Sequence, residues 1–157
     1  MAKREIYSTV FIVIYLVGVC SDGMLGANAQ TYPFDISADD WDDLVLKSEF
    51  PVLVMYTTLP CSKSPDTSYT ETCSVNQEHL NNVANHFIGR INMYRIDVGD
   101  YPWFEPTAIE FGMKGKDTFA IIDGGKLKDT LVFRSDSEEE LLMFISGYLG
   151  SLPNSYL

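Results

Sequence analysis

The segment Pro51–Thr57 constrains the fold of this chain more than any other. Its residues Val52-Leu53-Val54-Met55-Tyr56 are apolar at odd and even positions alike, whereas a strand with one solvated face alternates between apolar and polar side chains. Branched and aromatic side chains also favour a strand. We therefore predict that this segment is the central strand of a sheet that other elements cover on both faces.

The rest of the chain alternates between helical and strand-like patterns. Strands that are joined through helices are parallel, and a closing hairpin adds an antiparallel edge. We therefore expect one α/β sandwich with a mixed sheet, without repeats or linkers, over residues 30–157. Helices are expected at 37–48, at 106–112 and, after a cap at 137–140, at 141–149; a further helix has an apolar face from Val75 to Ile88, with Ser74 as its cap and Gly89 as its end. Strands are expected at 91–98, 118–122 and 130–134, and a short strand is possible at 32–36. Asp123-Gly124-Gly125 is expected to form the turn between the strands 118–122 and 130–134.

The first 29 residues have the pattern of a secretory signal peptide. Lys3 and Arg4 precede an apolar run over residues 10–19, and a polar stretch ends in Ala27-Asn28-Ala29. An apolar run of about ten residues is too short to span roughly 30 Å of hydrocarbon, so a membrane anchor is the weaker alternative. We predict cleavage after Ala29, no membrane association of the mature chain, and secretion or residence in the lumen of the endoplasmic reticulum, or in the periplasm if the source is bacterial.

The charge of the chain excludes one class of partner. The formal net charge is −11, and binding to nucleic acid or to an anionic bilayer depends on clustered Lys and Arg. We therefore expect that the chain binds neither nucleic acid nor an anionic membrane surface.

Two cysteines, Cys61 and Cys73, remain after removal of the signal, which takes Cys20 with it. In an oxidising compartment they favour a static disulfide, which would stabilise the fold by about 3 kcal/mol. A redox pair in which Cys73 resolves Cys61, and free or intermolecular thiols, are the alternatives. His79 and His86 lie on one helical face, but their spacing to the cysteines matches no compact zinc pattern. We predict no metal and no cofactor.

Three blocks of the sequence carry a family resemblance: Pro51–Tyr56 leading to Cys61, then Ile96-Asp97-Val98, then Phe111–Phe119 running into the Asp123 turn. Over residues 36 to 150 the chain resembles the thioredoxin superfamily, including single domains of the protein disulfide isomerases. The resemblance implies a thioredoxin-like three-layer α/β sandwich with a central mixed sheet. It also implies that Cys61 occupies the position of the nucleophilic cysteine.

The tetrad Cys61-Ser62-Lys63-Ser64 departs from the family pattern of two cysteines two residues apart at a helix N-terminus. Ser64 stands where the resolving cysteine would be, so a mixed disulfide at Cys61 has no neighbouring thiol to release it. Ser64, Pro65 and Asp66 also predict that the helix starts at Ser64, beyond Cys61. Cys61 would then lose much of the stabilisation that the helix dipole gives a thiolate.

Three further positions differ from what the resemblance implies. Met55 replaces the buried acid of the central strand, and Pro60 replaces the aromatic residue before the nucleophile. Asp117 replaces the cis-proline that faces the cysteine and offers its backbone to substrate, which makes Asp117 and Thr118 candidate binding residues. A cis bond without proline costs about 2.5 to 4 kcal/mol, so we expect the bond before Asp117 to be trans. A carboxylate there would raise the pKa of a nearby thiol.

The segment Tyr101-Pro102-Trp103-Phe104 is a second candidate for binding. It follows an expected strand, and open α/β sheets bind partners beyond the carboxyl ends of their strands. Tyr and Trp dominate interaction hot spots, so Tyr101, Trp103 and Phe104 are candidate contact residues. The alternative is that Trp103 and Phe104 pack under the loop as core.

A second resemblance concerns function. Lys47–Phe50, Val52–Val54 and Thr58-Leu59-Pro60 are similar to redox-inactive lumenal relatives of protein disulfide isomerase, which keep the fold and bind protein. We therefore predict a polypeptide-binding, chaperone-like protein rather than an efficient dithiol oxidoreductase. The alternative is an atypical thiol–disulfide oxidoreductase with Cys61 as nucleophile and Cys73 as resolving thiol.

Overall fold

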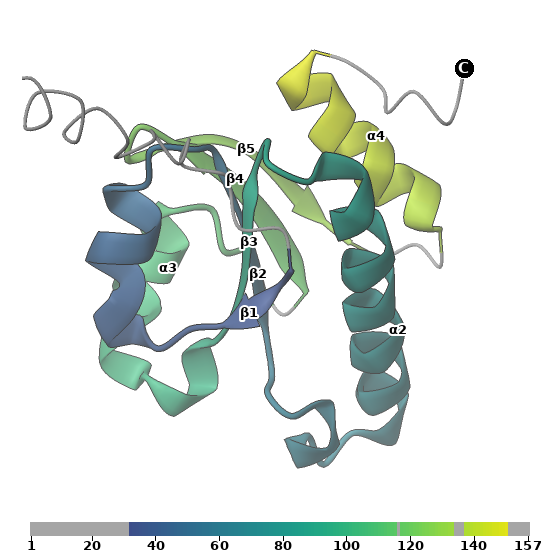
Figure 1. The fold of residues 1–157 in the computed structure, drawn as a ribbon. Coiled ribbons are helices and arrows are strands. Elements are labelled where there is room, and N and C mark those ends of the chain that lie inside the picture. The colour runs from purple at the N-terminus through teal and green to yellow at the C-terminus, as the bar shows by residue number, and fades with distance from the viewer. Residues whose placement is uncertain (1–31, 116, 134–136, 151–157) are drawn as a thin grey trace, which may run out of the picture.

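The computed structural model describes residues 32–115, 117–133 and 137–150, and these form one five-stranded sheet with helices on both faces (Figure 1). The strand order is β1-β3-β2-β4-β5. β1 and β2 run parallel to β3, whereas β4 is antiparallel to both β2 and β5. The prediction of a mixed sheet is confirmed. The strands are β1 (Phe34–Asp35), β2 (Val52–Thr57), β3 (Asn92–Asp97), β4 (Thr118–Asp123) and β5 (Lys126–Val132).

Helices complete the outer layers of the sandwich. In Figure 1, α2 and α4 lie on one side of the sheet, and the N-terminal helical segment and α3 lie on the other. This arrangement confirms the three-layer α/β architecture. The helices are α2 (Thr67–Ala84), α3 (Glu105–Glu110) and α4 (Glu138–Leu149), with short helical turns η1 (Ala38–Asp40), η2 (Asp42–Leu46), η3 (Cys61–Lys63), η4 (Asn85–Phe87), η5 (Val98–Asp100) and η6 (Pro102–Phe104).

The central strand β2 owes its place to apolar side chains on both of its faces, and all six of its residues are buried. Leu53 and Met55 belong to the core that α2 and α4 cover. Val54 and Tyr56 belong to the second core, on the opposite face, together with Trp41. Both faces therefore gain from burial of apolar surface, as the sequence pattern predicted.

The hairpin between β4 and β5 turns at the two predicted glycines. Asp123 pairs with Lys126, so Gly124 and Gly125 alone form the loop. Their φ angles are 57° and 69°, which is the left-handed backbone that a two-residue hairpin turn requires and that glycine adopts without strain. β5 begins at Lys126, earlier than residue 130, because charged residues suit an exposed edge strand. The predicted end of this strand at residue 134 lies outside the described residues.

The predicted start of the second long helix is wrong in both of its versions. α2 begins at Thr67, and the carboxylate of Asp66 accepts hydrogen bonds from the backbone N–H groups of Ser68 (3.0 Å) and Tyr69 (3.4 Å). Neither Ser64 nor Ser74 is the cap. The first turns of α2 are mostly exposed and polar, so the apolar periodicity that locates a helix becomes visible only later in the sequence.

Replacing Asp66 with alanine is expected to lower the free energy of unfolding by about 1 kcal/mol, because two N–H groups at the start of α2 lose their acceptor. Denaturation in urea measures the change. Glu78→Ala, an exposed position in the middle of the same helix, is the control and should change stability by less than about 0.5 kcal/mol. Equal effects of the two substitutions would contradict the assignment of the cap.

Within the described residues, no helix has the length and apolar character needed to cross a membrane. The predicted signal over residues 1–29 and its cleavage site lie outside the described part of the chain.

Candidate functional site

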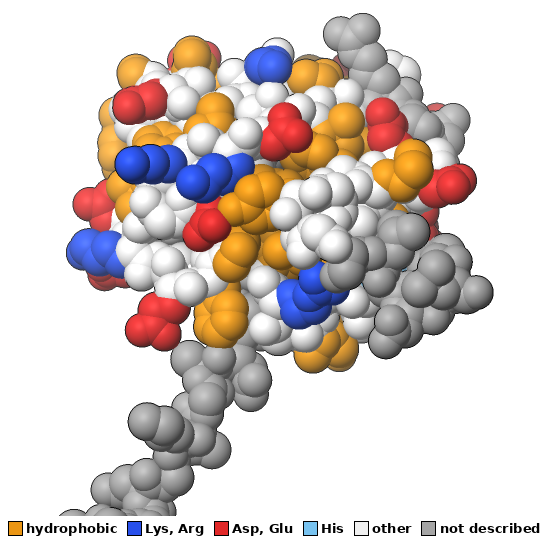
Figure 2. Space-filling view, turned by 90° about the horizontal axis from the view of Figure 1, so that it is seen from above, with side chains coloured by type: hydrophobic (Ala, Val, Ile, Leu, Met, Phe, Trp, Pro, Cys, Tyr) orange, Lys and Arg blue, Asp and Glu red, His pale blue; other side chains and the backbone are white. Residues whose placement is uncertain are grey.

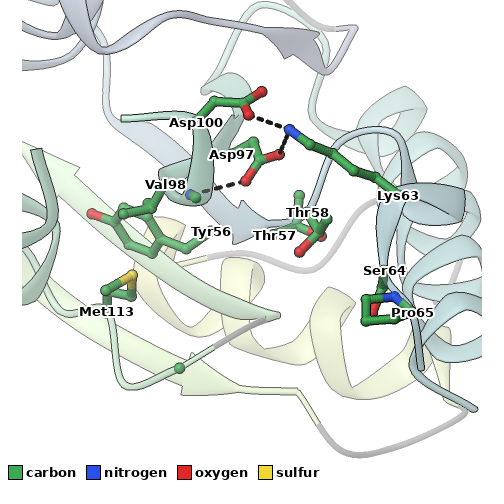
Figure 3. A pocket seen from close by; sticks show the side chains of 12 residues that line it. Tyr56, Thr57, Thr58, Lys63, Ser64, Pro65, Asp97, Val98, Asp100 and Met113 are labelled. Carbon is green, nitrogen blue, oxygen red and sulfur yellow. Dashed lines mark hydrogen bonds and ion pairs between the residues drawn. The ribbon is translucent and has the colours of Figure 1, made fainter. Parts of the chain in front are cut away.

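A cleft of about 290 Å³ opens at the carboxyl ends of β2 and β3, where the sequence predicted a binding region. Figure 3 shows Tyr56 and Met113 on one side of it and Ser64 and Pro65 on the other. Two further hollows adjoin the cleft at η5. One is lined by Asp35 and Tyr101, and the other by Pro102 and Glu105. The cleft thus combines an apolar floor with a largely acidic rim.

Lys63 ties the loop after β2 to the end of β3 (Figure 3). Its ammonium group is paired with Asp100 and lies 3.4 Å from Oδ2 of the buried Asp97. Asp97 also accepts hydrogen bonds from the backbone N–H groups of Leu59 (3.0 Å) and Gly99 (2.9 Å). The hydrogen bond to Asp100 is the main cause that raises the pKa of Lys63. Lys63 therefore stays charged and holds η3 against η5.

Cys61 and Cys73 are joined by a disulfide, with their Cα atoms 5.7 Å apart. Cys61 lies in η3 and is 7% exposed, whereas Cys73 lies within α2 and is fully buried. Neither residue is at the N-terminus of α2, which begins at Thr67. Stabilisation of a thiolate by a helix dipole fades within one turn, so α2 gives Cys61 little of it.

Ser64, which the resemblance placed at the position of a resolving cysteine, lies between η3 and α2. Its backbone N–H donates to the carbonyl oxygen of Cys61 (3.2 Å), and its hydroxyl accepts from the N–H of Asp66 (3.3 Å). Ser64 thus shapes the turn that leads into α2. Among the residues that the structure describes, no three His, Cys, Asp or Glu side chains are grouped to hold a metal ion.

Asp117, which the resemblance placed where it would face substrate, is buried (3% exposed). Its Oδ1 accepts hydrogen bonds from the hydroxyls of Thr57 (2.9 Å) and Tyr69 (3.2 Å), and its Oδ2 accepts from Nδ2 of Asn76 (3.0 Å). The Thr57 hydroxyl oxygen in turn lies 3.4 Å from Sγ of Cys73. Burial is the main cause that raises the pKa of Tyr69, which therefore keeps its proton as a donor. The site thus contains a carboxylate that is linked through one hydroxyl to the disulfide.

The backbone of Asp117 fixes this side chain in place. Its N–H donates to the carbonyl oxygen of Tyr56 (2.7 Å), and its carbonyl accepts from the N–H of Phe133 (3.1 Å). Its φ angle is +57°, a conformation that Asp and Asn tolerate better than most residues. The predicted trans bond before Asp117 involves residue 116, which lies outside the described residues. Thr118 is also buried, and its hydroxyl donates to the carbonyl of Gly115 (2.9 Å).

Sequence reasoning did not find the partners of Asp117. A weak signal was present, because Tyr69, Cys73 and Asn76 are spaced to share one face of a helix. The apolar face was predicted to begin only at Val75, after a cap at Ser74, and this left Tyr69 and Cys73 outside the expected helical face. Met55, which the resemblance placed at the position of a buried acid, lies fully buried among apolar side chains.

The three aromatic residues after η5 do not act as one patch. Trp103 is 64% exposed and lies with its ring centroid 6.4 Å from that of the half-buried Tyr101. Phe104 is buried and packs against Trp41 at 4.9 Å between centroids. The prediction of Phe104 as a contact residue is therefore wrong, and so is the alternative that Trp103 belongs to the core.

Comparison with known proteins supports the architecture. No protein-family model matches the chain. Thioredoxin M2, chloroplastic, of Arabidopsis thaliana is 28% identical over 97 residues, 62% of this chain and 46% of that protein. Thioredoxin M-type, chloroplastic, of Pisum sativum is 25% identical over 97 residues, 62% of this chain and 49% of that protein. The chain thus spans about half the length of these relatives.

Among solved structures, the Trx4 domain of ERdj5 superposes with a TM-score of 0.56 at 14% identity, covering 76% of this chain and 97% of that domain. At this level of identity the likeness concerns the fold alone. Together with the sheet order, it shows that the chain has the thioredoxin-like fold.

Proposed function

We propose that this thioredoxin-fold protein binds a polypeptide segment in the cleft beside β2 and β3, and that its Cys61–Cys73 bond is a static disulfide. One observation carries the proposal: both cysteines are buried, while the cleft next to them is open. Thiol–disulfide exchange needs a sulfur that an attacking thiolate can reach. The surface that a partner meets at this end of the molecule is therefore the cleft.

The lining of the cleft suits an extended polypeptide. Val98 and Met113, which are half-buried, offer apolar surface for side chains. Trp103 follows Pro102, which borders the continuation of the cleft, and its exposed ring suits a hot-spot contact. The acidic rim favours a partner without a strong negative charge of its own.

A static disulfide also supports the proposal that the protein belongs to the secretory pathway, as a secreted or lumenal protein. Structural disulfides persist in oxidising compartments and are rare in the cytosol. The signal-peptide pattern of the first 29 residues also favours the secretory pathway.

Fluorescence anisotropy tests the binding proposal. The probe is a labelled polypeptide that has been reduced and carboxamidomethylated, so that it is unfolded and has no free thiol. We expect saturable binding, and Trp103→Ala should weaken the affinity at least about tenfold.

Ile88→Ala is the matched control for this experiment, because Ile88 is exposed to nearly the same degree (61%) and follows the C-terminal end of α2, away from the cleft. Figure 2 looks onto the end of the molecule opposite the η3 loop, where apolar side chains also reach the surface between charged ones. The control should leave the affinity unchanged within twofold. Absence of binding, or an equal loss in both variants, would contradict the proposal.

The second candidate function is an atypical thiol–disulfide oxidoreductase. It is favoured by the unequal burial of the two sulfur residues, since Cys61 keeps some exposure and Cys73 keeps none. In that role Cys61 would be the nucleophile and Cys73 the resolving thiol. Catalytic turnover of disulfides distinguishes the two candidates.

A further inference from the structure

We propose that the buried carboxylate of Asp117 protects the Cys61–Cys73 disulfide from reduction, by opposing negative charge on the sulfur of Cys73. This inference goes beyond polypeptide binding and is independent of it. It assigns Asp117 as a positioning and electrostatic residue that acts through Thr57.

The contacts around Cys73 give its sulfur more acceptors than donors. The hydroxyl of Thr57 donates its proton to Asp117 (2.9 Å), so it faces the sulfur, 3.4 Å away, with its oxygen. The carbonyl oxygen of Thr58 lies 3.5 Å from the same sulfur. The side-chain amide of Gln77 is a donor, at the longer distance of 3.7 Å. Such surroundings suit a neutral sulfur better than a thiolate.

Asp117 adds a charge of the same sign as the thiolate. It accepts hydrogen bonds from Thr57, Tyr69 and Asn76, the donor set that an ionised carboxylate needs when it is buried. Because Oδ1 of Asp117 lies 2.9 Å and Sγ of Cys73 lies 3.4 Å from the hydroxyl oxygen of Thr57, this carboxylate oxygen and the sulfur are at most 6.3 Å apart. At that distance inside a protein, two like charges repel strongly.

This repulsion acts on a defined chemical step. Attack on the disulfide is slow because both cysteines are buried, and it falls on Cys61, which keeps 7% exposure whereas Cys73 keeps none. A thiolate of an external dithiol attacks Sγ of Cys61, the S–S bond breaks, and Cys73 leaves with the electron pair as a thiolate. Cys73 then takes up a proton, and the second thiol of the reductant displaces Cys61. The reductant becomes a cyclic disulfide, and the protein gains two electrons and two protons. The rate depends on how readily the leaving sulfur carries negative charge, which Asp117 opposes.

The test compares reduction rates of folded wild-type protein and Asp117→Asn with dithiothreitol at pH 7.5, followed by alkylation and mass spectrometry. Asparagine tolerates the positive φ angle, and its side-chain oxygen still accepts from Thr57 and Tyr69. Its side-chain NH2 group is a donor, so the side-chain amide of Asn76 rotates and accepts with its oxygen. We expect the variant to be reduced at least about tenfold faster, because the leaving sulfur no longer faces a charge. An unchanged rate, within twofold, would overturn the proposal.

Two controls separate the electrostatic effect from other causes. Tris(hydroxymethyl)phosphine, an uncharged reductant that is oxidised to its phosphine oxide with one water, expels the same leaving sulfur, so the acceleration should persist with it. Asp100→Asn removes a negative charge beside η3, the turn that contains Cys61, and should change only the rate with the anionic dithiothreitol thiolate. If Asp117→Asn accelerates reduction by dithiothreitol alone, repulsion of the incoming anion explains the effect and the proposal is wrong.

A second pair of variants keeps the proposal testable if Asp117→Asn folds poorly. Thr57→Ser retains the hydroxyl between Asp117 and Cys73 and should be reduced as slowly as the wild type. Thr57→Val removes that hydroxyl, so the sulfur loses the oxygen that faces it, and reduction should be faster than in Thr57→Ser. Equal rates in the two Thr57 variants would contradict a role that acts through this hydroxyl.

Discussion

Replacing Asp117 with alanine is expected to lower the free energy of unfolding by about 3 to 5 kcal/mol, measured by urea denaturation of the oxidised protein. The substitution removes the acceptor of three buried or part-buried donors on Thr57, Tyr69 and Asn76. Each buried donor left without a partner costs about 1 to 3 kcal/mol. Alanine must also adopt the φ angle of +57°, which adds about 1 to 2 kcal/mol.

Asp117→Asn is the matched control for stability as well as for reduction. It keeps an acceptor for the two hydroxyls and tolerates the backbone conformation, so we expect a loss of less than about 1.5 kcal/mol. If the alanine and asparagine variants lose the same free energy, the hydrogen bonds to Asp117 do not contribute as the structure indicates.

Removing both cysteines in Cys61→Ala/Cys73→Ala is expected to cost about 3 kcal/mol of unfolding free energy. The two residues are separated by 12 positions, and a crosslink over a loop of this size reduces the entropy of the unfolded chain by that amount. The double substitution leaves no buried thiol unpaired, so the loss reports on the crosslink and on two small cavities.

The reduced wild-type protein is the comparison for this double variant. Its stability should also lie about 3 kcal/mol below that of the oxidised form, because the crosslink is absent in both. A double variant as stable as the oxidised wild type would show that the disulfide does not stabilise the fold.

The sequence was sufficient for the parts of the fold that local pattern determines. A strand with apolar residues at every position has to be covered on both faces, and β2 is at the centre of the sheet. Asp123-Gly124-Gly125 specifies a two-residue hairpin through its backbone requirements. Ser137 and the three glutamates after it specify the start of α4, which begins at Glu138.

The site was less predictable because it depends on contacts between distant segments. Asp117 and Thr57 are far apart in the sequence, and only the antiparallel pairing of β2 with β4 brings them together. The resemblance to the family gave Asp117 a place beside the cysteines, and from that place we predicted a residue that binds substrate. The structure instead buries it, because donors on β2 and α2 satisfy its carboxylate.

The separation of Trp103 from Phe104 has a similar cause. Both residues lie in η6, next to each other in the sequence, but a helical turn directs neighbouring side chains to different sides. Phe104 fills space against Trp41 in the core, and Trp103 remains at the surface. Composition alone does not distinguish the two.

The most direct test of a static disulfide in a polypeptide-binding domain is a turnover assay. It measures the reduction of a disulfide-containing protein by dithiothreitol, with and without a catalytic amount of the purified, folded chain. We expect no acceleration over the uncatalysed rate, and no difference between wild type and Cys61→Ala. Repeated turnover that Cys61→Ala abolishes would contradict it and would establish the chain as a thiol–disulfide oxidoreductase.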